Sequence, residues 1–272
     1  MSSTVAIIGG GGNVGSSIAF TLIIKQLTHE ILIVDVNEEA AEGQALDLRD
    51  AAYLSRTKCR KGTSQEAGQA DVIVISAGAR QKAGEKRTEL FERNYKIINS
   101  IMESMKPIKP DAKILVVSNP ADVLTHIAQA TSGHARHLVM GAGTFLDSGR
   151  LRLRLSEITG INPTSIHAYA LGVHGDEQFI AWSNATIGGM PLLSHSAMKG
   201  KDLGQIQKDV TETAYAIIEA KGSTYYGVAS HVAFIVNALL QNTEQVVPVT
   251  HYNKEFGCFL SWPAVIGIDG VK

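Results

Sequence analysis

The sequence predicts a mixed α/β protein, with an N-terminal doubly wound parallel sheet followed by a second domain of α+β type. Its first half alternates short, continuous apolar runs with stretches of helical spacing. Strands buried on both faces require continuous apolarity, and strand–helix repetition builds a parallel sheet covered by helices. After about Gly141 this alternation ends. We therefore place the first domain at residues 1–141 and the second at residues 142–272.

In the first domain, strands are predicted where β-rich apolar runs end in polar or glycine-containing loops. Helices are predicted where apolar residues recur at helical spacing. The expected strands are Thr4–Ile8, Glu30–Val34, Asp71–Ser76, Lys113–Ser118 and His137–Met140, and the expected helices are Asn13–Gln26 and Glu38–Leu54.

The second half contains longer helical stretches. A helix is expected over Phe145–Thr159, and a longer helical region covers Asp202–Leu240. We expect residues 222–224 (Gly-Ser-Thr) to interrupt the longer region, because a glycine inside a helix costs about 1 kcal/mol. Two β-rich runs at residues 245–250 and 258–267 predict an antiparallel hairpin.

The composition points to an intracellular globular protein without nucleic-acid or membrane partners. The 272 residues are 44% hydrophobic and 19% charged, with a formal net charge of -1 and no basic block or acidic tail. The N-terminus lacks the charged and apolar regions of a signal peptide, and no apolar run approaches the roughly 20 residues of a membrane span. Cys59 and Cys258 fit a reducing compartment, although the sequence leaves open a disulfide between them. We expect a cytoplasmic protein.

A glycine-rich turn between the first strand and the first helix predicts a dinucleotide site. The segment GGGGNVG contains G-x-G-x-x-G as Gly10, Gly12 and Gly15, with Asn13 and Val14 between the last two. The extra Gly9 also permits G-x-x-G-x-x-G, so the phase of the turn stays open. Glycines let the backbone approach a pyrophosphate, and the following helix N-terminus supplies N–H donors and partial positive charge.

Asp35 ends the second strand, 20 residues after Gly15. A carboxylate at this place accepts hydrogen bonds from ribose hydroxyls and repels a 2′-phosphate, which favours NAD over NADP. The alternative is a ligand-free glycine turn with Asp35 capping the helix that starts at residues 37–39.

Five further motifs occur in a fixed order along the chain. They are AGARQKAGEKR (Ala77–Arg87), VSNPAD (Val117–Asp122), FLDSGR (Phe145–Arg150), LGVHGDE (Leu171–Glu177) and AKGSTYYG (Ala220–Gly227). In these motifs and their spacing the sequence resembles the L-lactate/malate dehydrogenase family, closest to its NAD-dependent lactate dehydrogenases. The resemblance covers essentially the whole chain.

The resemblance implies a Rossmann NAD-binding domain, a substrate domain and reversible hydride transfer between L-lactate and pyruvate. It also implies a homo-oligomer, either a dimer or a tetramer. Two alternatives remain at this point. One is a malate or broader L-2-hydroxy-acid dehydrogenase on the same scaffold, and the other is a non-catalytic NAD-binding protein.

Oxidation of a 2-hydroxy acid needs a base of near-neutral pKa, and histidine suits this task. His174 matches the family's base, although a lone histidine in a polar loop is more often structural. Asp147 matches the carboxylate that orients this histidine; without the resemblance it is equally a helix N-cap. Arg150 shares a helix face with Asp147 and resembles the arginine that binds the substrate carboxylate through two hydrogen bonds.

Other site residues follow from the same resemblance. Arg87, in a loop that resembles a mobile lid, would polarise the substrate carbonyl, whereas its alternative is a solvated arginine at a helix start. Asn119 would contact both the nicotinamide and the substrate oxygen. Ala77 and Gly78 would line the cofactor at the end of their strand. We predict no metal site.

Gln81 is the position that favours lactate over malate. In the family, arginine at the matching lid position accompanies dicarboxylates, and glutamine accompanies lactate. A second substrate carboxylate without a cationic partner costs roughly 3–5 kcal/mol in a closed site. At 1.36 kcal/mol per tenfold, this predicts a roughly hundred- to few-thousand-fold preference for pyruvate. Thr224 would line the same small pocket, and the neighbouring Lys82 would partly rescue a dicarboxylate.

Arg152 and His167 match positions that bind a phosphate between subunits in lactate dehydrogenases activated by fructose bisphosphate. The alternative is a surface arginine on a helix and a histidine on a strand, and we prefer this alternative.

The chain departs from the family pattern at several positions. Ala83 replaces a common lid proline, and Val173 replaces a glutamate before the base. Gly149 stands where alanine is usual, which is expected to loosen the turn from Asp147 to Arg150 by up to about 1 kcal/mol. Family members usually continue past Lys272 into a long final helix that backs the lid, so we expect that helix to be absent and lid closure to be affected.

Overall fold

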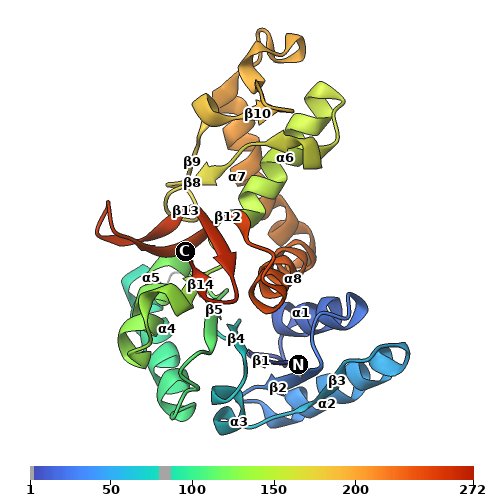
Figure 1. Cartoon of the computed structure of the whole chain (residues 1–272), viewed down its shortest axis with the longest axis vertical. Helices are drawn as coiled ribbons and strands as arrows, with labels where there is room; N and C mark the ends of the chain where they lie inside the picture. The colour runs from blue at the N-terminus through green and yellow to red at the C-terminus, as the bar shows by residue number, and fades with distance from the viewer. Residues whose placement is uncertain (1–2, 80–86) are drawn as a thin grey trace.

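The computed structural model describes residues 3–79 and 87–272, and the side chains of all of these except residues 87 and 88. Six parallel strands form the centre of the molecule in the order β3-β2-β1-β4-β5-β6. This is the strand order of a doubly wound sheet that reverses between β1 and β4, so the predicted fold class is confirmed (Figure 1). The strands are β1 (Thr4–Ile8), β2 (Glu30–Val34), β3 (Lys58–Lys61), β4 (Val72–Ile75), β5 (Lys113–Val116) and β6 (Val139–Gly141).

The strands are apolar at successive positions because helices cover both faces of the sheet. Val5 and Ile7 of β1 point into one buried cluster, whereas Ala6 and Ile8 point into the other. The first cluster contains side chains of α1, α2 and α8, and the second contains side chains of α3, α4 and α5. These helices are α1 (Asn13–Ile24), α2 (Glu38–Ala51), α3 (Ser64–Gly68), α4 (Arg87–Ser104), α5 (Ala121–Ser132) and α8 (Tyr226–Gln241).

Much of the second half forms a smaller lobe, which lies above the large sheet in Figure 1. Its own core is formed by apolar residues such as Leu151, Leu155, Ile206 and Val210. The predicted interruption of the long helical region is confirmed, since Gly222 ends α7 in the left-handed conformation (φ 85°) and α8 begins at Tyr226. The elements are α6 (Phe145–Thr159), α7 (Leu203–Lys221), β7 (Ile166–His167), β8 (Ala170–Leu171), β9 (Phe179–Ile180), β10 (Thr186–Ile187) and β11 (Met190–Pro191).

The predicted hairpin forms, but it extends the large sheet. Its strands are β12 (Gln245–Asn253) and β13 (Cys258–Gly267), followed by β14 (Gly270–Val271). Thr250 of β12 pairs antiparallel with Gly141 of β6, so the hairpin completes a nine-stranded sheet within the described residues. Because α8 also packs on α1, the last part of the second half shares the core of the first. The division at residues 141 and 142 therefore stays a prediction.

Several boundaries differ slightly from the sequence predictions. The strand expected at His137–Met140 begins at Val139, because Arg136–Leu138 forms a short 3-10 turn. The first helix ends at Ile24, and the second passes into a 3-10 turn at Ala52–Leu54. Cys59 is buried and Cys258 is exposed, and both are free thiols. None of the helices in the described part of the chain combines the length and the apolar character that a membrane crossing needs.

Candidate active site

His174 and Asp147 meet although they come from different elements. His174 lies in the loop between β8 and β9, and Asp147 lies in the first turn of α6. The His174 Nδ1 atom lies 2.8 Å from Asp147 Oδ2. An ionised carboxylate only accepts hydrogen bonds, so Nδ1–H is the donor and Nε2 is left to exchange a proton with a ligand.

Arg150 binds the other oxygen of the same carboxylate. Its Nη1 atom donates to Asp147 Oδ1 over 3.0 Å, and the two side chains are only 11% and 3% exposed. The alternative reading of Asp147 as a helix cap is wrong, because the N-cap residue of α6 is Thr144. His174, Asp147 and Arg150 therefore form one chain of contacts around a buried carboxylate.

The contacts shift the pKa values of both titratable groups. Burial alone would raise the pKa of Asp147, but the hydrogen bond from His174 and the charges of His174 and Arg150 outweigh it and lower that pKa. Burial alone would lower the pKa of His174, but the hydrogen bond to Asp147 and the charges of Asp147 and Asp122 outweigh it and raise that pKa. The pair therefore favours an imidazolium beside a carboxylate.

The β8–β9 loop is held from two sides. Gly172 and Ser261 of β13 exchange both backbone hydrogen bonds, each 2.9 Å long. Asp122 at the start of α5 accepts a hydrogen bond from the backbone N–H of His174 over 2.8 Å. The buried Asp122 carboxylate also accepts from the Thr250 hydroxyl (2.7 Å) and from the Ser261 hydroxyl (3.3 Å). It thereby joins α5, the hairpin and the loop of His174.

Asp122 lies in the VSNPAD motif, but sequence reasoning did not assign it a role. We expect Asp122→Asn to lower kcat/KM about tenfold, because a neutral amide removes the charge that strengthens the bond from the His174 N–H and that helps to raise the pKa of His174; tenfold corresponds to about 1.4 kcal/mol. Stability should fall by about 1.5–3 kcal/mol, the range for a hydrogen bond to a charged group. Steady-state kinetics and urea unfolding measure the two effects.

Thr250→Val is the matched control, since it removes a hydroxyl from the same carboxylate and leaves the contact with His174 in place. We expect it to lower stability with a smaller effect on kcat/KM. An Asp122→Asn variant with the catalytic efficiency of the original enzyme would show that this contact does not position His174.

The glycine turn has the shape that a dinucleotide needs. Gly9 has a φ of 84°, and a Cβ there would lie 2.6 Å from Ala77 N; a Cβ on Gly15 would lie 2.5 Å from Gly9 O. These contacts support the G-x-x-G-x-x-G spacing of Gly9, Gly12 and Gly15, in which Gly10 is an additional glycine. Gly12 is the N-cap of α1, and a Cβ there would meet only Gly9 O, at 3.5 Å. The space beside Gly12 and the helix N-terminus therefore fits a pyrophosphate.

Asp35 lies at the rim of this turn. Its Oδ2 atom accepts from Gly11 N and its Oδ1 atom from Asn37 N, both over 3.0 Å. Asn37, not Asp35, caps α2 through its bond from Ala40 N. A partly exposed carboxylate at the carboxyl end of β2 fits a ribose, so these residues are suited to hold NAD.

The loops after β4 and β5 complete this edge of the sheet. Asn119 is exposed after β5, and Ala77 and Gly78 follow β4. Asn94 of α4 joins the two loops, since its buried side chain accepts from Ala79 N over 2.7 Å and donates to Asn119 O over 3.2 Å. Sequence reasoning missed Asn94, because nothing in the sequence distinguishes it from a solvated asparagine.

Other predicted residues take no part in the hydrogen bonds described above or lie outside the described residues. Gln81 and the side chain of Arg87 lie outside them; the backbone of Arg87 begins α4. Thr224 lies between α7 and α8, and α8 packs on α6. Arg152 donates from Nε to Ala168 O over 3.1 Å and lies over the Tyr169 ring. His167, which precedes Ala168 in the sequence, is exposed.

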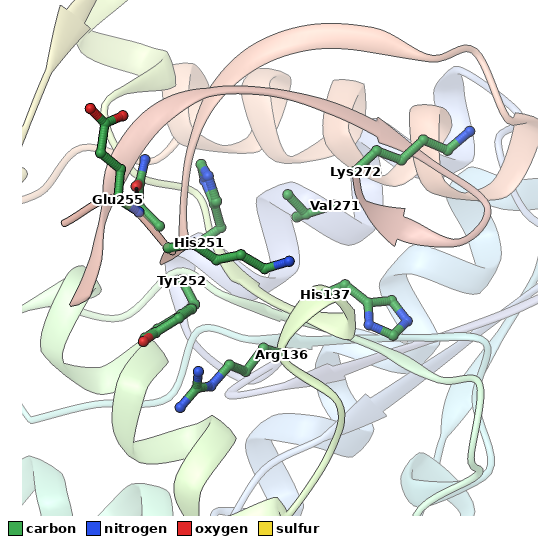
Figure 2. Close-up of a pocket in the computed structure, with 9 residues that line it drawn as sticks. Arg136, His137, His251, Tyr252, Glu255, Val271 and Lys272 are labelled. Carbon is green, nitrogen blue, oxygen red and sulfur yellow. Dashed lines mark hydrogen bonds between the residues drawn. The ribbon is translucent and has the colours of Figure 1, made fainter. Parts of the chain in front are cut away.

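A separate cavity of about 680 Å³ lies at the hairpin. Figure 2 shows Arg136, His251, Tyr252 and Lys272 around it. None of the predicted site residues that the structure describes lines this cavity, so the cavity is separate from the His174–Asp147–Arg150 contacts. Among the described residues, no three His, Cys, Asp or Glu side chains gather as a metal ion would require.

Comparison with protein families identifies the scaffold. The lactate/malate dehydrogenase NAD binding domain matches residues 3–141, and the lactate/malate dehydrogenase alpha/beta C-terminal domain matches residues 144–272. The chain belongs to the lactate/malate dehydrogenase family. As a member it is an NAD-dependent oxidoreductase, which confirms the cofactor predicted from the glycine turn and Asp35.

Individual dehydrogenases of this family resemble the chain over nearly its full length. L-lactate dehydrogenase A of Rhizopus oryzae is 47% identical over 270 residues, which cover 99% of this chain and 84% of that enzyme. L-lactate dehydrogenase of Bacillus velezensis is 42% identical, covering 98% and 87%. The ligand-bound minor L-lactate dehydrogenase of Enterococcus mundtii superimposes with a TM-score of 0.94 at 34% identity, covering 100% and 89%. These similarities support lactate dehydrogenase function.

Proposed function

We propose that this chain is an L-lactate dehydrogenase that interconverts L-lactate and pyruvate, with His174 as general acid and base. The observation that carries the proposal is the contact chain His174–Asp147–Arg150, in which one buried carboxylate holds both the proton-transfer group and a guanidinium. A 2-oxo acid needs these two groups together, one for its ketone and one for its carboxylate.

In pyruvate reduction, the protonated His174 donates its Nε2 proton to the ketone oxygen as the alcohol forms. In lactate oxidation, neutral His174 removes the hydroxyl proton at the same atom. Throughout the reaction the Nδ1–H group of His174 stays hydrogen-bonded to Asp147, because that contact fixes the tautomer and stabilises the imidazolium. When bound, the nicotinamide cofactor supplies or accepts the hydride.

The remaining residues bind and orient the substrate. Arg150 would hold the substrate carboxylate with its N–H groups other than the one on Asp147. Arg87 would polarise the ketone after lid closure, and Asn119 would contact the substrate oxygen from the end of β5. Gly9, Gly12 and Asp35 would hold the dinucleotide.

The substrate preference rests on Gln81 and Thr224, since a neutral lid side chain leaves a second carboxylate without a partner. We expect pyruvate to be turned over faster than oxaloacetate, and Gln81→Arg to shift the ratio of the two kcat/KM values toward oxaloacetate by at least about tenfold, equal to 1.4 kcal/mol. NADH oxidation with each substrate measures both. Faster turnover of oxaloacetate by the unmodified chain would favour a malate dehydrogenase instead, and NADH binding without turnover would favour a non-catalytic protein.

We further propose a cytoplasmic homo-oligomer, a dimer or tetramer. Exposed apolar side chains on the outer helices support association, among them Phe20 and Ile24 on α1 and Leu54 after α2. Sedimentation velocity measures the oligomeric state. Fructose bisphosphate is a candidate effector through Arg152 and His167, although the Arg152 Nε–H already donates to the Ala168 carbonyl. Repeating the pyruvate assay with fructose bisphosphate, and with Arg152→Gln, tests this role.

A further inference from the structure

His231 fills the space that a side chain at Gly149 would occupy. Gly149 lies on α6 between Asp147 and Arg150, whereas His231 comes from the second turn of α8. A Cβ on Gly149 would lie 2.4 Å from His231 Nε2 and 3.0 Å from Cε1. Glycine inside a helix costs about 1 kcal/mol relative to alanine. Gly149 is not among the positive-φ residues of the described chain, so the room for the imidazole ring is the physical reason for glycine here.

The ring of His231 is fixed on its other sides. Its Nδ1 atom donates to the Gly227 carbonyl over 2.8 Å, which directs Nε2 toward α6. Its edge meets the Phe145 ring with the centroids 4.7 Å apart and the planes at 76°. One turn earlier, a Cβ on Gly227 would lie 3.1 Å from Leu146 Cδ1. The start of α8 therefore closely supports the first two turns of α6.

His231 also lies in the electrostatic environment of the site. Burial is the main cause that lowers its pKa; Arg150 and Arg152 of α6 lower it further, and Asp147 and the Gly227 carbonyl oppose them. At neutral pH the ring is uncharged. It therefore supports α6 without competing with His174 for Asp147 or repelling Arg150.

We propose that His231 is a positioning residue, which sets the orientation of Arg150 toward the substrate carboxylate by supporting the Gly149 turn of α6. This inference rests on the proposed function. It also changes the expectation for Gly149, because the turn that glycine should loosen is held from outside by an imidazole ring.

A double-mutant cycle tests the inference. We expect His231→Ala to raise the KM for pyruvate at least about fivefold with little change in kcat, because the cavity lets Arg150 move while His174 keeps its contacts. Gly149→Ala should raise KM by a similar factor, since its methyl group would collide with the ring. In the double variant the methyl group takes the place of the ring, and we expect KM to return to within about twofold of the original value. Steady-state kinetics and urea unfolding of all four proteins give the coupling in KM and in stability.

His134→Ala is the control, because it removes another partly buried histidine, which lies after α5 beside Lys109 and Ala112 and not on α6 or α8; its KM should not change. A loss of stability without a change in KM would mean that His231 only packs, which overturns the inference. A double variant no better than the worse single variant would also overturn it. If the unmodified chain did not reduce pyruvate, the proposed function itself would fail, and this inference with it.

Discussion

Asp147→Asn is expected to lower kcat/KM for pyruvate reduction by about 10²–10⁴-fold at neutral pH, the range that general acid–base catalysis contributes. The carboxylate is the main cause that raises the pKa of His174 against its burial. The amide keeps an acceptor for Nδ1–H but removes the negative charge, so burial then lowers the pKa of His174. Less of the enzyme carries the proton that pyruvate reduction needs.

The pH profiles of the two reaction directions show in which direction the pKa of His174 has moved. Pyruvate reduction requires protonated His174, so its rate is retained at low pH and lost as the pH rises through the raised pKa of the folded protein. Lactate oxidation requires neutral His174 and rises through the same pKa. In Asp147→Asn both limbs should move to lower pH. Profiles of kcat/KM measured in both directions test this.

Asp71→Asn is the matched control for these profiles. Asp71 also has a lowered pKa: burial would raise it, but Lys109 and the Thr4 backbone N–H outweigh that effect, far from His174 in the fold. This substitution should lower stability and leave the two pH limbs in place. Limbs that stay at the same pH in Asp147→Asn would show that another group donates the proton.

Much of the central sheet was predictable from the sequence because its strands are buried on both faces. β1 and β2 begin and end where their apolar runs do. β3 was not predicted, since its sequence KCRK is polar and lies at the edge of the sheet. The hairpin was predicted as local structure, but its place in the large sheet depends on a long-range pairing between Thr250 and Gly141. Local patterns carry no information about such a contact.

The same distinction applies to the site. His174, Asp147 and Arg150 were identified because their motifs resemble those of a family, and the structure brings the three side chains together. The contributions of Asp122 and His231 come from contacts between distant segments. The sequence showed Gly149 as a departure from the family pattern, but the ring that occupies its space became visible only in the fold.

Arg150→Lys is expected to lower kcat/KM for pyruvate by about 10²–10³-fold. A guanidinium offers several N–H donors in one plane, so it can bind Asp147 and a substrate carboxylate at once, whereas an ammonium is a single charged point. A hydrogen bond to a charged group contributes about 1.5–3 kcal/mol, and each 1.36 kcal/mol is about tenfold in rate. The loss of one to two such bonds gives the expected range. Most of it should appear in KM, with a further loss in kcat from misplacement of the ketone relative to His174.

Arg154→Lys on the same helix separates this effect from a general one. Arg154 forms ion pairs with Glu157 and Asp209 while 44% of its side chain is exposed, and water and salt weaken such surface pairs. We expect its kinetics to match those of the original enzyme within about twofold. If Arg150→Lys behaved in the same way, the substrate carboxylate would be bound elsewhere, and the contact between Arg150 and Asp147 would serve only to hold the first turn of α6.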